Sequence, residues 1–119
     1  MRDPTRGGLA TVAHEIAAAT TFDLRLAETA TPVREPVRAV CAMLGYDPYY
    51  LACEGRVVAV VAPGQAEEAM ARWRRLPGGA EARIIGTVRE GRGRVILETE
   101  LGGERLLDEL EDDPLPRIC

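Results

Sequence analysis

The chain has 119 residues, of which 46% are hydrophobic and 29% are charged, and its formal net charge at pH 7 is −4. This length and balance are typical of one globular domain with a single core. The negative charge argues against a nucleic-acid partner, and no apolar run approaches the roughly 20 residues of a membrane helix.

The cysteine and histidine content limits which metal or disulfide sites the chain is able to form. There are three cysteines, Cys41, Cys53 and Cys119, and one histidine, His14. An odd number of cysteines without paired spacing predicts neither a disulfide framework nor a metal site. We therefore expect a reducing, cytoplasmic environment, with Cys41 packed in the core.

The first third of the chain predicts a helix followed by a strand. Asp3-Pro4 is typical of a helix cap with proline in the first turn. Apolar residues then recur at helical spacing, which predicts one buried stripe: Leu9, Val12, Ala13, Ile16 and Ala17. Residues 22–26 alternate between apolar residues and the charged Asp23 and Arg25, so they predict a strand with one solvent-facing side.

The middle of the chain predicts a second helix and two strands. Pro36 begins the helix and Gly45 ends it. Four of its residues are expected to face inward: Val37, Val40, Cys41 and Leu44. Residues 49–53 and 57–62 read as strands. The second is apolar throughout, which predicts a central position in the sheet.

The last third predicts one helix and three strands. The helix would bury Ala66, Ala69, Met70 and Trp73, and Pro77-Gly78-Gly79 would end it. Strands are expected at 83–88, 94–98 and 105–107. This order of elements predicts an α+β fold in which helices pack on a mixed β-sheet.

Residues 111–119 lack any periodicity and contain two prolines after an acidic start. We therefore expect a domain at 1–110 and a flexible tail at 111–119 that carries Cys119. Proline favours an extended conformation, so the thiol would be able to visit more than one active site. The alternative is a frayed terminus with an incidental cysteine.

Two adjacent glycines precede the first apolar stripe. Gly7 and Gly8 would leave backbone N–H groups open at a helix start, where the helix dipole favours an anion such as a nucleotide phosphate. Arg6 lies beside them in the sequence. Ordinary capping with close helix packing is the alternative explanation.

Two further residues are candidates for proton transfer. Glu54 follows a predicted strand, and a partly desolvated carboxylate there can act as a general base; a simple turn is the alternative. His14 flanks the apolar stripe of the first helix, where packing or capping competes with proton transfer.

Three segments together resemble one family. The opening residues 1–10, the middle residues 47–56 and the closing Pro114-Leu115-Pro116-Arg117-Ile118-Cys119 are similar to the C-terminal domain of the HypE family of hydrogenase maturation factors. The Gly-Gly segment is shared with the wider superfamily of aminoimidazole ribonucleotide and selenophosphate synthetases, whereas the Pro-Arg-Ile-Cys ending is specific to the family. The resemblance implies the PurM-like C-terminal-domain fold.

The resemblance also implies a mechanism. The thiol of Cys119 would receive a carbamoyl group from the carbamoyltransferase HypF. ATP would phosphorylate the carboxamide oxygen, phosphate would leave, and the nitrogen would lose its protons to give a thiocyanate. The HypC–HypD complex would then carry the cyanide to the iron of the [NiFe] centre. Glu54 matches the family's glutamate and becomes the candidate base, with His14 next.

The chain departs from the family in three respects. Cys53 stands where the family usually has Asn, and Arg56 where it has Lys. The family's own N-terminal domain, which would bind most of the ATP, is not in this sequence, so we expect the domain alone to be inactive. Two other functions stay open: a docking module for maturation partners, and a ligand-binding domain of a related synthetase.

Overall fold

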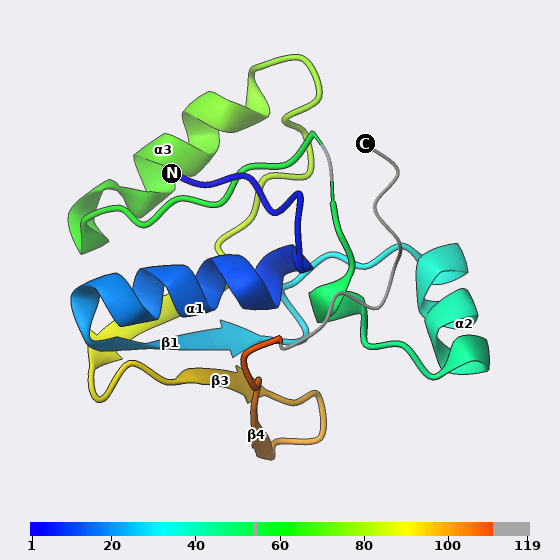
Figure 1. Cartoon of the computed structure of the whole chain (residues 1–119). Coiled ribbons are helices and arrows are strands. Elements are labelled where there is room, and N and C mark those ends of the chain that lie inside the picture. Colours follow the sequence, from blue (N-terminus) through cyan, green and yellow to red (C-terminus); the bar gives the residue numbers. More distant parts are fainter. Residues whose placement is uncertain (54, 111–119) are drawn as a thin grey trace.

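The computed structural model describes residues 1–53 and 55–110. Figure 1 shows the helices and the small sheet of these residues. The elements in chain order are α1 (Gly8–Thr20), β1 (Phe22–Ala27), α2 (Glu35–Leu44), the 3₁₀ turns η1 (Pro48–Tyr50) and η2 (Pro63–Gln65), α3 (Ala66–Arg74), β2 (Gly86–Glu90), β3 (Val95–Glu98) and β4 (Glu104–Leu106). None of the helices in these residues is long and apolar enough to cross a membrane.

The four strands form one mixed sheet in the order β2-β1-β3-β4. Strand β1 is antiparallel to β2 and parallel to β3, and β4 pairs antiparallel with β3. Leu24 at the centre lies opposite Val88 on one side and Val95 on the other. The prediction of helices on a mixed sheet is confirmed.

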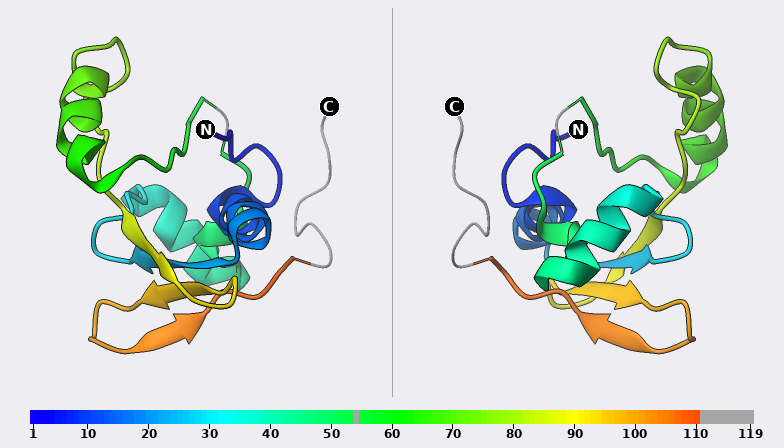
Figure 2. Two further views of the ribbon diagram at one scale, coloured as in Figure 1. Left: turned by 90° about the vertical axis from the view of Figure 1, so that its left-hand side faces the viewer. Right: turned by 90° about the vertical axis from the view of Figure 1, so that its right-hand side faces the viewer.

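Helix α1 covers one face of this sheet and builds the core with it (Figures 1 and 2). The predicted stripe of α1 faces inward, with Leu9 and Ile16 partly buried at its flanks. The core joins small residues of α1 to large residues of the two central strands and the η1 turn: Ala10, Ala13, Ala17, Leu24, Leu26, Tyr49, Val95, Leu97 and Leu107.

The predicted helix start at Asp3-Pro4 is wrong. Helix α1 begins at Gly8, with Gly7 as its N-cap. The residues before it are held extended, because Arg2 and Val58 exchange two backbone hydrogen bonds of 2.8 Å and the Pro4 carbonyl accepts the Cys53 N–H at 2.8 Å. These long-range bonds outweigh the local capping signal.

The two strands predicted at 49–53 and 57–62 are also wrong. The Asp47 side chain accepts the Tyr49 N–H at 3.1 Å, and this cap folds Pro48–Tyr50 into a 3₁₀ turn. Residues 57–62 contribute only the isolated bridge between Val58 and Arg2. They are not central, since β2 and β3 already occupy both edges of β1.

Burial on the second and third helices is lower than predicted. On α2 only Cys41 is buried, whereas the other three predicted positions are exposed: Val37, Val40 and Leu44. Among the described elements α2 packs only against η1, so most of its apolar stripe has no partner. On α3 the predicted positions are the partly buried ones, but none is fully buried.

Strand β1 departs from simple alternation. Leu24 and Leu26 are buried as predicted, but Asp23 is buried too and Phe22 at the strand start is exposed. The expected solvent-facing side therefore does not include Asp23. The backbone after β2 satisfies its carboxylate, which removes the cost of burying it.

Candidate functional site

The start of α1 is pressed against the η1 turn. Gly7 and Gly8 both have φ of +64°, in the left-handed region that glycine adopts without strain. A Cβ atom at Gly8 would lie 2.6 Å from the Tyr49 carbonyl oxygen and 2.5 Å from that of Leu51. Close backbone packing therefore explains why Gly8 is glycine. A phosphate contact at this helix start stays a prediction.

The arginines near this helix start differ in their surroundings. Arg6 is exposed beside the buried Gly7. Arg2 forms an ion pair with Glu15 on the outer side of α1. Of the two, Arg6 is the guanidinium without an ion pair to a described residue.

Two segments distant in the sequence meet next to the helix start. The hydrogen bond between Cys53 and Pro4 and the bridge between Val58 and Arg2 bring Cys53 and Val58 alongside residues 2–4. Cys53 is exposed there. Gly55 has φ of +71° and nothing within 4 Å of its missing side chain, as expected for a residue in an open turn. Glu54 lies outside the described residues, so its role as a base stays a prediction.

His14 connects α1 to the end of the sheet. Its Nε2 atom lies 2.5 Å from the Leu107 carbonyl oxygen, and the ring is partly buried. A carbonyl accepts, so Nε2 carries the proton in this contact. This favours the packing alternative for His14. It lies six residues along α1 from Gly8, which is about 9 Å of helix.

Cys119 and the rest of segment 111–119 lie outside the described residues. The chain leading to it is anchored at Asp108, whose carbonyl oxygen accepts the Tyr50 hydroxyl at 2.8 Å. Tyr50 belongs to η1, the turn that also packs on Gly8. The anchor therefore starts the approach to Cys119 on the same part of the domain as the helix start.

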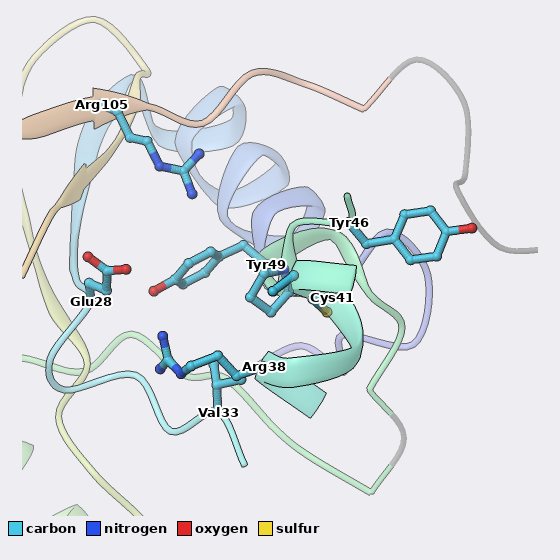
Figure 3. Close-up of a pocket in the computed structure, with 9 residues that line it drawn as sticks. Glu28, Val33, Arg38, Cys41, Tyr46, Tyr49 and Arg105 are labelled. Carbon is cyan, nitrogen blue, oxygen red and sulfur yellow. The ribbon is translucent and has the colours of Figure 1, made fainter. Parts of the chain in front are cut away.

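The sequence did not predict a pocket of about 210 Å³ between α2, η1 and the ends of β1 and β4. Figure 3 shows Tyr49 in its middle, with Arg38 and Arg105 on opposite sides of the ring and Glu28 near its hydroxyl. Asp47-Pro48 is the sequence signal that would have indicated it, because the capped turn places Tyr49 there.

Within the part of the chain that the structure describes, no cluster of three or more His, Cys, Asp or Glu residues is able to hold a metal ion.

Comparison with known proteins identifies the fold family. Residues 1–98 match the family described as AIR synthase related protein, C-terminal domain. The chain belongs to this family. The predicted PurM-like C-terminal-domain fold is thereby confirmed, and the mixed four-stranded sheet with α1 on one face is the form that this domain takes here.

Within the family, HypE proteins are close relatives. This AIR synthase C-terminal domain is 47% identical over 120 residues to the carbamoyl dehydratase HypE of Azotobacter vinelandii, covering 100% of the chain and 35% of that protein. A crystal structure of the hydrogenase maturation protein HypE in complex with ATP superposes with a TM-score of 0.89 at 47% identity, over 95% of the chain and 36% of that protein. A crystal structure of a HypE–HypF complex superposes with a TM-score of 0.87 at 38% identity, over 92% of this chain and 35% of the matched chain.

The chain thus spans about a third of the length of the curated relatives that it matches. The resemblance to HypE noted from the sequence is confirmed across the whole chain, including the middle segment around Cys53.

Proposed function

We propose that this chain is the C-terminal part of a carbamoyl dehydratase that makes the cyanide ligands of [NiFe] hydrogenase. The observation that carries the proposal is the 47% identity with a carbamoyl dehydratase HypE over the entire chain. The Pro-Arg-Ile-Cys ending supports it further, because it supplies an acceptor thiol at Cys119.

The proposed reaction has two stages. The thiolate of Cys119 attacks a carbamoyl donor held by HypF, forming an S–C bond to the carboxamide carbon while the bond from that carbon to the donor's leaving group breaks. The carboxamide oxygen then attacks the γ-phosphorus of ATP and ADP leaves. Loss of both N–H protons and of the oxygen as phosphate gives the thiocyanate, so water is removed overall at the expense of one ATP.

The chain length permits the thiol to serve both stages. From the anchored Asp108 carbonyl, the residues 109–119 extend to at most about 36–40 Å. This reach allows Cys119 to meet HypF and then return to an ATP site. A solved HypE–HypF complex and a HypE structure with ATP support both encounters.

Within this proposal, the domain supplies the thiol and the base, and an N-terminal domain supplies most of the ATP site. Arg6 and the N–H groups after Gly7 and Gly8 would add contacts to the ATP phosphates. Glu54 would accept a proton from the carboxamide nitrogen. Transfer of the cyanide to the HypC–HypD complex would follow, in the cytoplasm.

Exchange of this chain for the matching third of the A. vinelandii HypE tests the proposal. With HypF, carbamoyl phosphate and ATP, the hybrid should gain the mass of a carbamoyl group and then lose the mass of water. Cys119→Ser should abolish both changes, and Cys53→Ser, at the exposed second thiol, should leave them intact. A hybrid that is folded but never carbamoylated would refute the proposal.

A further inference from the structure

The pocket beside Tyr49 has the composition of a ligand site. Its polar wall carries two guanidinium groups and one carboxylate, from Arg38, Arg105 and Glu28. The lining also includes apolar residues from the loop before α2, from α2 itself and from η1: Val33, Ala42 and Pro48. A small cavity with an apolar wall and a few convergent polar groups is typical of small-molecule binding.

The Tyr49 hydroxyl is the group that most strongly indicates a ligand. The residue is only 5% exposed, and its hydroxyl, which stays accessible at the pocket surface, makes no hydrogen bond to a described residue. Figure 3 shows it directed into the pocket. Burial, with the nearby carboxylates of Glu28 and Asp47, raises the pKa of Tyr49 against the opposing effect of the two arginines, so the phenol stays a donor.

The charged groups around the Tyr49 hydroxyl keep donors and acceptors that no described residue uses fully. Among the described residues, the nearest carboxylate to the Arg38 guanidinium is that of Glu35, at 4.0 Å, which is the limit of an ion pair. One oxygen of Glu28 accepts the Glu100 N–H at 2.7 Å, and the other has no described partner. Arg105 is the most fixed, because it pairs with Asp47 at 2.8 Å and lies over the Tyr49 ring, 5.8 Å from its centroid.

These charges select a ligand that carries both signs. A simple anion would be attracted by Arg38 but repelled by Glu28, and a simple cation would face two arginines. With Asp47 counted, the surroundings of the pocket are formally neutral. A ligand with separated positive and negative groups would pair with both the guanidinium and the carboxylate groups at once.

We propose that this pocket binds a small α-amino acid. Its carboxylate would accept from the Arg38 guanidinium and the Tyr49 hydroxyl, and its ammonium group would donate to Glu28. A short aliphatic side chain would pack against Val33, Ala42 and Pro48. The inference goes beyond the proposed dehydratase role and does not depend on it.

Amide NMR of the ¹⁵N-labelled 119-residue chain, titrated with L-valine, tests the proposal. Saturable shifts at Tyr46, Tyr49 and the neighbouring amides are expected. Two probes of the same shape each lack one charge: 3-methylbutanoate has no ammonium group and isobutylamine has no carboxylate. Each should bind at least about tenfold more weakly, since a charged hydrogen bond contributes at least that factor.

Matched variants connect the binding to the named groups. Tyr49→Phe removes only the hydroxyl, and Arg38→Gln and Glu28→Gln each remove one charge. Every one should weaken L-valine by about tenfold. Arg72→Gln, on the exposed face of α3 and paired only with Glu68, is the control and should bind as the parent does. The Arg38 side chain is 45% exposed and is not part of the core, so its variant keeps the test valid should Tyr49→Phe fail to fold.

Three outcomes would overturn the inference. The first is no saturable shift with L-valine up to its solubility limit. The second is equal binding of 3-methylbutanoate, which would make the pocket a carboxylate site. The third is parental affinity in Arg38→Gln and Glu28→Gln.

Discussion

Asp23 and Arg94 form a two-sided clamp on the turn between β2 and β3. The Asp23 Oδ1 atom accepts the backbone N–H groups of Arg92 and Arg94, both at 2.9 Å. Its Oδ2 atom accepts Nη2 of Arg94 at 2.6 Å and Nε at 3.1 Å. One carboxylate of β1 thereby holds the start of β3, the strand beside it.

The clamp predicts acid sensitivity. Hydrogen bonds from the Arg94 side chain, followed by those from the Arg94 and Arg92 backbone, hold the pKa of Asp23 well below its usual range. A group with a lowered pKa stabilises the fold fully above its unfolded pKa of about 3.9. That contribution is lost as the pH falls from there toward the folded pKa.

Asp23→Asn should therefore lower Tm at pH 7 by about 5 °C or more, because the amide cannot accept from all four donors. The difference from the parent should shrink below about pH 4. Thermal unfolding followed by circular dichroism at pH 7 and pH 3 measures both effects. Glu90→Gln, on the exposed end of β2, is the control; an equal loss there would contradict the clamp.

Gly8→Ala should destabilise the domain strongly. The new Cβ atom would meet the Tyr49 and Leu51 backbone at 2.5–2.6 Å, and the backbone has positive φ. A cost of more than about 2 kcal/mol in the free energy of unfolding is expected, measurable by urea denaturation. Gly64→Ala has open space around it and should change stability by less than about 0.5 kcal/mol. Similar midpoints for the two variants would refute the close packing at Gly8.

Glu54→Gln, tested in the HypE hybrid, should accept the carbamoyl group at the parental rate but form thiocyanate more slowly. The amide cannot take up the proton, and the loss of a general base usually costs roughly 100- to 10,000-fold. Quenched-flow mass spectrometry separates the two steps, with Glu67→Gln on exposed α3 as the control. If dehydration keeps its rate, Glu54 is a turn residue, and His14 becomes the next candidate.

The 119-residue chain on its own should neither bind ATP tightly nor hydrolyse it. Its only nucleotide-like signature is the Gly7-Gly8 helix start, and it has no P-loop. Titration calorimetry should find no micromolar affinity, and a phosphate-release assay should find no turnover. Micromolar binding would mean that this domain holds more of the ATP site than proposed; millimolar binding would not.

The two described thiols should differ in reactivity. Cys53 is exposed, whereas Cys41 is 3% exposed as the one buried residue of α2. In a Cys119→Ser background, iodoacetamide should modify Cys53 at least about 100-fold faster than Cys41, which reacts only after local opening. Peptide mass spectrometry over time resolves the two rates. Equal rates would show that α2 opens freely in solution.

The sequence predicted best where local pattern and final packing agree. The stripe of α1 and the strands at β1, β3 and β4 were recognisable because their spacing matches the faces that they bury. Asp3-Pro4 and Asp47-Pro48 carry the same capping signal, yet only the second caps a turn. Long-range bonds from Arg2 and Pro4 to the segment 53–58 decide the first case, and no local rule contains them.

The candidate site was predictable only in part. Family resemblance identified Cys119 and Glu54 as candidates, and the glycine pair indicated the helix start. The packing role of Gly8 was not predictable, because it depends on the η1 turn, which the sequence predicted as a strand. The Tyr49 pocket joins residues of the stretch 28–49 to the distant Arg105, so no local spacing along the chain predicts it. The burial of a charged side chain was not predictable either. Asp23 occupies a strand position that the alternation of apolar and charged residues assigns to the solvent-facing side.

The parallel pairing of β1 with β3 has a consequence for how the chain is made. The strand Phe22–Ala27 obtains its two neighbours, β2 and β3, only from residues 86–98. A ribosome therefore releases α1 and β1 long before their sheet is able to close, and every residue from α2 to α3 is synthesised in that interval. Such distant pairing is slow to form, and the apolar side chains of Leu24 and Leu26 stay without strand partners until the last third of the chain arrives.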